Sequence, residues 1–248
     1  MRLSYKLQKV LSGDAFNSAR RHVRQWVIGR APLRFDAAKI TATIDRARFQ
    51  EIYDRYAMEN PGDEWPKYLE IERWMEINLK RVRDLGLDLG GRKRVLDIGS
   101  GTGYFLYICK YLGHDVLGMD VDWERGFTEM VSLLGVERVI WQVEAYQPLP
   151  DLGRKFDVIT AHMICFNGHK SDKLWKISEW EFFLDDLAAN HLEPGGQVCL
   201  ELNREYDDSL YTPELKAYFE SRGADIHTQR VHFNPLLPAP VAAAPVAR

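Results

Sequence analysis

The chain has 248 residues, of which 46% are hydrophobic and 28% charged, the composition of an ordinary globular protein. Its formal net charge of −3 gives no overall attraction to a polyanion, so no nucleic-acid partner is expected. No apolar run approaches the ~20 residues that a transmembrane helix needs, and none is expected.

The three cysteines, Cys109, Cys165 and Cys199, lie far apart and lack Cys-x-x-Cys spacing. Cys109 and Cys199 stand in apolar segments, where a cysteine acts as a small hydrophobic side chain. Neither a disulfide framework nor a metal site is therefore expected. A reducing compartment, and with it a cytoplasmic location, is favoured.

Residues 1–34 contain eight basic residues and one acid, a balance of +7, so the remainder of the chain carries −10. A helix in this segment would place Phe16, Ala19, Val23, Trp26 and Val27 on one side. Such a basic amphipathic helix can lie peripherally on an anionic membrane or bind a protein partner. It can equally pack on its own domain with a solvated basic face, and an Arg-rich, acid-poor start is also compatible with a transit peptide.

Two helices are predicted ahead of the first strand, over residues 37–58 and 66–85. Pro66 suits the first position of the second helix, and Gly86 suits its stop. An apolar stripe at helical spacing runs through Ile71, Trp74, Met75, Val82 and Leu85. Residues 1–90 are therefore assigned to an N-terminal helical extension or cap.

From residue 93 onward, short apolar strands alternate with helices. This pattern predicts an α/β domain with a doubly wound, mostly parallel sheet over residues 91–233. The tail 234–248 is rich in Pro and Ala and is expected to be disordered. The expected strands are 93–98, 115–119, 138–143, 155–160, 196–202 and 225–233, and the expected helices are 104–112, 124–134, 175–191 and 213–221.

The most informative segment runs from Arg94 to Phe105 and reads RVLDIGSGTGYF. A buried strand ends in Asp97, three glycines follow at alternate positions, and an apolar helix begins at Tyr104. Alternate glycines let the backbone pass close to a ligand, because no Cβ intervenes. The helix directs its unpaired N–H groups and positive dipole end at the same place. The segment therefore predicts a nucleotide-type site.

Two common nucleotide motifs do not fit this segment. The dinucleotide fingerprint Gly-x-Gly-x-x-Gly needs a glycine where Tyr104 stands, and the phosphate-binding P-loop needs a Gly-Lys-Ser/Thr that the segment lacks. A dinucleotide or nucleotide-sugar enzyme on a similar sheet is disfavoured for this reason.

The segment resembles motif I of the class I S-adenosylmethionine-dependent methyltransferases, in which an acidic strand end precedes Gly-x-Gly-x-Gly. The resemblance extends over about residues 90–205 and implies a Rossmann-like methyltransferase fold with S-adenosylmethionine as cofactor. The family has an antiparallel strand pair where only the strand 225–233 is evident here, so the end of the sheet is expected to be trimmed. The further matching segments are Asp120, Glu144-Ala145 with Leu149-Pro150, the strand 155–162, and the turn Leu192–Gly196.

The resemblance also implies roles for individual residues. Asp97 would lie near the methionine end of the cofactor, Asp120 would accept the ribose hydroxyls, and Val121 would lie against the adenine. Glu144 would meet the adenine amino group. The full set of cofactor-binding candidates is Asp97, Gly99, Ser100, Gly101, Gly103, Tyr104, Asp120, Val121, Glu144 and Ala145.

Methyl transfer requires alignment of acceptor, methyl and sulfur, and it requires a general base only when the acceptor must lose a proton. His162 and His169 follow the fourth strand at the carboxyl edge of the sheet, so both are candidate catalytic bases. The alternatives are a backbone-fixing role for His162 and a solvent-exposed loop position for His169. Candidates for orienting a polar substrate, with structural roles as the alternative, are Asn167, Glu201 and Asn203.

These observations predict a transferase that O-methylates a small-molecule or glycan-type acceptor. One alternative is N-methylation of an amine or a protein side chain. Another is a non-catalytic S-adenosylmethionine-binding partner protein. The oligomeric state is left open.

Overall fold

The computed structural model describes residues 35–59 and 65–239. The basic segment 1–34 lies outside these residues, so its expected membrane or protein contact stays a prediction. Most of the tail expected to be disordered, residues 240–248, also lies outside them. Leu237, within the described part of that tail, accepts a hydrogen bond from Arg222 Nε at 2.7 Å.

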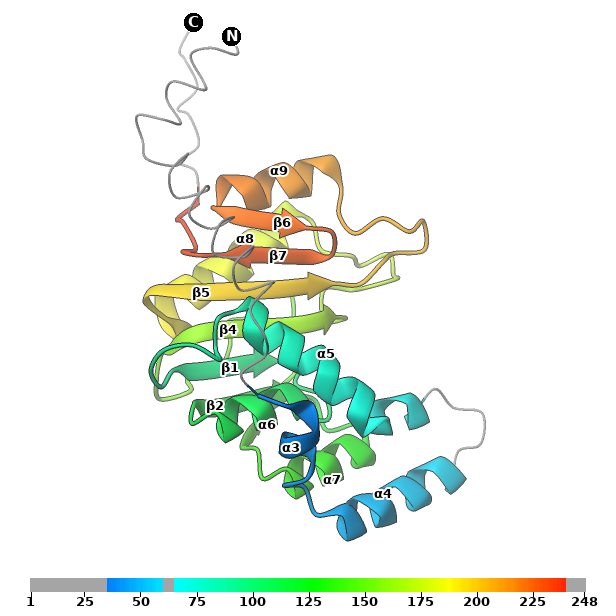
Figure 1. Ribbon diagram of the computed structural model, residues 1–248. Coiled ribbons are helices and arrows are strands. Elements are labelled where there is room, and N and C mark those ends of the chain that lie inside the picture. Colours follow the sequence, from blue (N-terminus) through cyan, green and yellow to red (C-terminus); the bar gives the residue numbers. More distant parts are fainter. Residues whose placement is uncertain (1–34, 60–64, 240–248) are drawn as a thin grey trace, which may run out of the picture.

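A seven-stranded sheet forms the centre of the described fold, in the order β3-β2-β1-β4-β5-β7-β6 (Figure 1). The first five strands in this order are parallel, and β7 runs antiparallel to both of its neighbours. This arrangement confirms the predicted doubly wound, mostly parallel α/β fold. The strands are β1 (Arg94–Ile98), β2 (Asp115–Asp120), β3 (Arg138–Ile140), β4 (Phe156–Ile164), β5 (Leu192–Leu202), β6 (Ala224–His227) and β7 (Arg230–Phe233).

Helices cover both faces of the sheet, and each face has its own buried apolar cluster. None of the helices in the described residues is long and apolar enough to cross a bilayer. One face carries α3 (Ala37–Thr41), α4 (Arg46–Glu59), η1 (Trp65–Leu69), α5 (Ile71–Asp84), α6 (Tyr104–Tyr111) and α7 (Arg125–Leu133). The other carries α8 (Ile177–Asp186), the π-helical turn η2 (Leu187–His191) and α9 (Pro213–Ser221).

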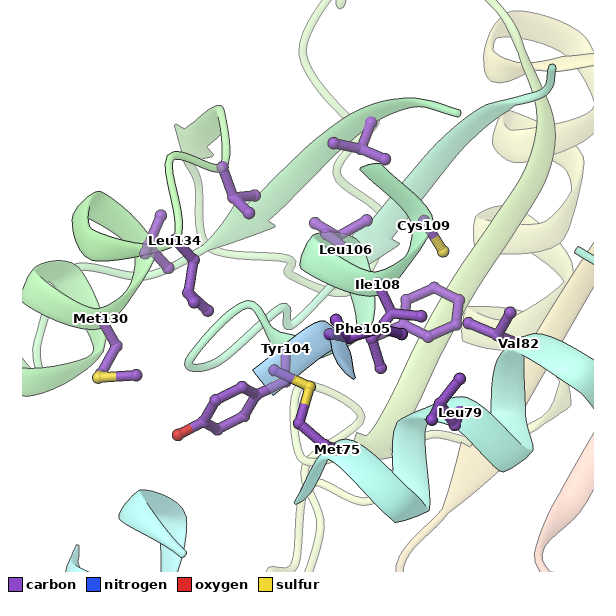
Figure 2. Packing of buried hydrophobic residues seen from close by; sticks show 14 of the residues in the cluster. Met75, Leu79, Val82, Tyr104, Phe105, Leu106, Ile108, Cys109, Met130 and Leu134 are labelled. Carbon is purple, nitrogen blue, oxygen red and sulfur yellow. The ribbon is translucent and has the colours of Figure 1, made fainter. Parts of the chain in front are cut away.

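The apolar stripe of α5 packs directly on α6 (Figure 2). Met75 and Val82 of α5 are fully buried, and they lie in one cluster with Phe105 and Ile108 of α6. Burying one such side chain contributes about 1.5–3 kcal/mol. The helices ahead of β1 are therefore held against the sheet by a shared core, and α5 lies over the part of the sheet where the candidate site is found.

The end of the sheet that β7 and β6 form differs from the single strand predicted there. The residues expected to form one strand, 225–233, fold as the antiparallel pair β6 and β7, so the sheet is not trimmed. The turn between them is Thr228-Gln229, with Thr228 at φ +50°. The sequence contains no Gly, Pro, Asn or Asp at this point, so the usual signal for a hairpin is missing.

The start of β5 also differs. Residues 192–196 were expected to form a turn before the strand, but β5 already begins at Leu192, which pairs with Phe156. The next pair along the two strands joins Gln197 to Val158, so the extra residues bulge out of the strand. Gly195, at φ +78°, supplies the backbone conformation that this bulge needs.

Candidate functional site

The glycine loop leaves open space where a ligand could approach. Gly99, Gly101 and Gly103 have φ values of +73°, +53° and +83°, a region that favours glycine. A Cβ built on Gly99 or Gly101 meets no atom within 4 Å. The backbone on either side is tied to β2, because the Gly99 N–H donates to the Met119 carbonyl at 2.7 Å. Residues 99–103 therefore form a fixed backbone cradle at the start of α6, the glycine cradle, which is open at Gly99 and Gly101.

Asp120 lies at this loop, as predicted from its position at the end of β2. Its carboxylate accepts the N–H of Gly101 at 2.6 Å and the N–H of Val121 at 2.8 Å. Burial raises the pKa of Asp120, although the two backbone N–H groups oppose that shift. Each carboxylate oxygen retains a second lone pair, so the group can still accept ribose hydroxyls.

Two candidates in the same loop are turned inward. The Tyr104 side chain is buried in the cluster between α5 and α6 and lies beside Met75 (Figure 2). The Ser100 hydroxyl is also buried, and it has no hydrogen-bond partner among the described residues. In this conformation both residues offer the cradle only their backbone groups.

Glu144 and Ala145 occupy the loop that follows β3, and both are exposed. Because β2 and β3 are parallel, this loop and Asp120 share the carboxyl edge of the sheet. No side-chain hydrogen bond links Glu144 to another described residue. Its predicted contact with the adenine therefore stays a prediction.

Asp97 and His162 form a buried pair between β1 and β4. His162 Nδ1 lies 3.1 Å from Asp97 Oδ1, and their side chains are only 6% and 4% exposed. The Thr160 hydroxyl donates to the same carboxylate oxygen at 2.6 Å. Because a carboxylate only accepts, a neutral His162 ring carries its proton on Nδ1 and its lone pair on Nε2. The pair thus presents an oriented imidazole with an unprotonated nitrogen.

Phe105, in the first turn of α6, fixes the same imidazole from the helix side. The two ring centroids are 4.7 Å apart and the planes are inclined by 65°. Since Asp97 stands two residues before Gly99, the imidazole is anchored next to the glycine cradle. The hydrogen bond of the His162 ring thus goes to a side chain, Asp97 Oδ1, and the alternative of a backbone-fixing histidine stays a prediction.

A second ion pair extends this polar region toward α5. Arg81 Nη2 lies 2.5 Å from Glu201 Oε2, and Arg81 Nη1 donates to Asn78 Oδ1 at 3.0 Å. Burial alone would raise the pKa of Glu201, but the positive charge of His162 when its ring is protonated, the charges of Arg81 and Arg230, and the hydrogen bond from Arg81 outweigh burial and lower the pKa. Glu201, one of the expected orienting groups, is therefore held as a carboxylate beside His162.

His169, the second candidate base, is engaged elsewhere. Its Nδ1 lies 3.0 Å from Glu205 Oε1, and the Lys170 N–H donates to the other oxygen of the same carboxylate. These bonds join the loop after β4 to the loop after β5. Among the described residues, no contact connects His169 to His162 or Asp97. Asn203 likewise joins the ends of β5 and β4, because its side-chain amide donates to the Ile164 carbonyl at 3.1 Å.

Thr160 and Arg81 were not among the candidates from sequence. Thr160 lay inside an apolar strand, and Arg81 stood beside the buried stripe of a helix, where a solvated arginine is the usual expectation. The contact that reveals Arg81 joins positions 120 residues apart. No spacing within the sequence signals such a contact.

Two curated proteins resemble part of this chain. A protein of Campylobacter hominis named tRNA U34 carboxymethyltransferase is 28% identical over 137 residues, which cover 53% of this chain and 42% of that protein. A protein of the same name from Dichelobacter nodosus is 31% identical over 140 residues, 54% of this chain and 39% of that protein. The match thus covers less than half of each relative.

These relatives correct one expectation. The net charge of −3 and the lack of a basic face predict no nucleic-acid partner, and with the helical cap and the polar loop after the fourth strand they predict a small-molecule or glycan acceptor, yet both relatives are named for a tRNA. The expectation is wrong because net charge averages over the whole chain and conceals where the cations lie. Lys80, Arg81 and Arg230, for example, line a single pocket.

Solved structures provide more distant likenesses. Ribosomal protein L11 methylase from Lactobacillus delbrueckii subsp. bulgaricus has a TM-score of 0.41 and 18% identity, over 63% of this chain and 72% of that one. DesVI of Streptomyces venezuelae has a TM-score of 0.41 and 20% identity, over 66% and 58%. Both are too distant to say more about this chain.

A family model described as a methyltransferase domain matches residues 69–233, well over half of the chain. The match includes α5, the glycine loop, Asp120 and the strands as far as β7. It confirms the predicted enzyme class and its S-adenosylmethionine cofactor. The chain therefore belongs to the methyltransferase-domain family.

Proposed function

We propose that this methyltransferase transfers a methyl group to a hydroxyl oxygen of an RNA acceptor, with His162 as the general base. The observation that supports the base is the buried Asp97–His162 pair beside the glycine cradle. The names of the curated relatives support the acceptor class.

The residues at the carboxyl edge fit the cofactor. The backbone at Gly99 and Gly101 is open on the side where a Cβ would stand, and Asp120 is fixed against the same loop. Asp120 would hold the ribose hydroxyls, and the first turn of α6 would offer its N–H groups. Val121, Glu144 and Ala145 are proposed for the adenine side.

When bound, S-adenosylmethionine supplies an electrophilic methyl group on a sulfonium whose sulfur departs as a neutral thioether. The task left to the protein is to align the acceptor oxygen and remove its proton. His162 takes that proton on Nε2, while Asp97 holds Nδ1 and stabilises the positive imidazole that results. Phe105 keeps the ring in place throughout.

Two exposed side chains suit an RNA acceptor near this edge. Tyr206, after β5, is 83% exposed, and Lys170 Nζ lies 5.6 Å from the centre of its ring. An exposed aromatic ring can stack on an unpaired base, and a neighbouring cation can contact phosphate. The bonds of His169 and Lys170 to Glu205 hold the two loops together.

A labelled transfer assay tests this proposal. The full chain is incubated with methyl-labelled S-adenosylmethionine and total tRNA, and the label in precipitated RNA is counted with and without ribonuclease. We expect ribonuclease-sensitive label. His162→Gln should lower the rate by about 100-fold, because a general base contributes 10²–10⁴.

His169→Gln is the matched comparison, since its ring binds Glu205 and not Asp97. We expect this variant to keep most of the activity. No label in RNA would contradict the proposed acceptor. Equal rates for His162→Gln and the wild type would contradict the proposed base.

A further inference from the structure

A pocket of about 380 Å³ lies between α5 and the tip of the β6–β7 hairpin. We propose that this pocket binds a backbone phosphate of the RNA acceptor, an inference that rests on the proposed function. It is lined by Ile77, Lys80, Arg81, Asp84, Glu201, His227, Thr228, Gln229 and Arg230.

The pocket wall carries an excess of positive charge. Arg81 pairs with Glu201 at 2.5 Å, and Arg230 pairs with Asp84 at 2.7 Å, so these four charges cancel. Lys80 is exposed and has no ion-pair partner among the described residues, which leaves the lining at +1. The rim residue His227 lies 3.4 Å from the carboxylate of Asp225, so it adds nothing to this balance.

The ion pair between Arg230 and Asp84 also positions hydrogen-bond donors of the Arg230 guanidinium in the pocket. The Arg230 guanidinium uses Nη1 to bind Asp84, and it donates no other hydrogen bond to the described residues. Its Nη2 and Nε therefore remain for a ligand, and the carboxylate fixes the plane of the guanidinium. The planar guanidinium of Arg230 can donate hydrogen bonds to phosphate oxygens, and the ammonium group of Lys80 can add a positive charge to the same ligand.

The pocket lies next to the strand that carries His162. Glu201 lines the pocket, and it lies on β5, the strand that pairs with β4, which carries His162. At the rim, Gln229 Nε2 lies 3.6 Å from the sulfur of Met163, the residue after His162. The hairpin tip is also bonded to the loop after β5, where the Tyr211 hydroxyl donates to the Thr228 carbonyl at 2.9 Å. A phosphate held here would anchor an RNA strand at the edge that carries His162.

Lys80→Ala gives the cleanest test, because this exposed side chain leaves no buried charge behind. Fluorescence anisotropy would measure the affinity of wild type and variant for labelled tRNA at several salt concentrations. We expect the Kd of Lys80→Ala to rise by about tenfold and the slope of log Kd against log salt to fall by about one. Lys80→Arg should retain the affinity.

Lys216→Ala is the matched control, since Lys216 is an exposed lysine on α9, which covers the other face of the sheet. It should bind tRNA as the wild type does. If Lys80→Ala keeps the wild-type affinity and salt slope while RNA is still methylated, the pocket proposal is overturned and the proposed function stands. If the wild type binds no tRNA, both fail.

Inorganic phosphate separates a site for RNA from a site for the free anion. At constant ionic strength, phosphate should compete with tRNA for the wild type, and Lys80→Ala should weaken that competition. If calorimetry detects phosphate binding that is lost in Lys80→Ala while tRNA affinity is unchanged, the site holds the free anion, and the RNA assignment is wrong.

Discussion

His162 Nδ1 lies 3.1 Å from Asp97 Oδ1, and both side chains are almost completely buried between β1 and β4. This relationship joins Asp97, near the end of β1, to the candidate base His162, which lies within the last residues of β4 and not in the loop after it. It also fixes which ring nitrogen is available for proton transfer. The pair is therefore expected to act as a unit.

A double-mutant cycle tests that coupling. His162→Gln and Asp97→Asn should each lower kcat by about 100-fold, and the double variant should lose little more, because residues that act as a unit are not additive. Single-turnover rates at saturating cofactor would measure the effect. Losses that multiply in the double variant would show that the two residues act separately.

The glycine cradle can be tested with a matched pair of substitutions. Gly101→Ala and Gly113→Ala both place a Cβ at positive φ, +53° and +90°, and neither Cβ meets an atom within 4 Å. Each should cost about 1–2 kcal/mol of stability, measured by urea unfolding. Gly101→Ala should also weaken cofactor binding by at least about tenfold, equivalent to ~1.4 kcal/mol.

Gly113 follows α6 at the opposite end of that helix from the cradle, so Gly113→Ala should leave the affinity for S-adenosylmethionine unchanged. Equal cofactor affinities in the two variants would mean that the open side of Gly101 does not face the ligand.

The ion pair of Glu201 predicts a pH dependence of stability. The lowered pKa means that the Glu201 contribution is fully present above the ordinary value of 4.5 and is lost as the pH falls through the lower folded-state value. At pH 7, Glu201→Gln should lower the free energy of unfolding by about 1–3 kcal/mol. The difference from the wild type should shrink below about pH 4.5.

Glu220→Gln is a suitable control, because Glu220 is 55% exposed and lies 4.0 Å from Lys216. A surface pair of this kind contributes about 0–1 kcal/mol. A Glu201→Gln deficit that does not change with pH would contradict the assignment of its stability to the carboxylate charge.

Local patterns predicted much of this fold and part of its site. The acidic strand end, the alternate glycines and Asp120 could be found because each marks the end of a parallel strand, and such ends meet at one edge of the sheet. The same reasoning brought His162 to that edge. The positions of these residues at the strand ends do not predict the contact between Asp97 and His162, because that contact depends on the directions of two side chains on neighbouring strands.

Other features have no local signal. The Thr228-Gln229 turn lacks the residues that mark a hairpin, and Arg81 meets Glu201 only after α5 packs on the sheet. Tyr104 was assigned to the cofactor by its place in the motif, but its side chain fills the core between α5 and α6. The exclusion of nucleic acid was wrong for a related reason, because a net charge sums over the whole chain and does not show where the cations lie.

The central claim is that the glycine cradle and Asp120 bind S-adenosylmethionine, and calorimetry of that cofactor tests it most directly. Asp115→Asn is the control, because Asp115 begins the strand that Asp120 ends and pairs with Arg154 at 3.3 Å. We expect one cofactor per chain for the wild type and Asp115→Asn, and about 10–100-fold weaker binding for Asp120→Asn, the effect of losing hydrogen bonds to a charged group. Undetectable binding to the wild type, or equal affinity in all three proteins, would contradict the claim.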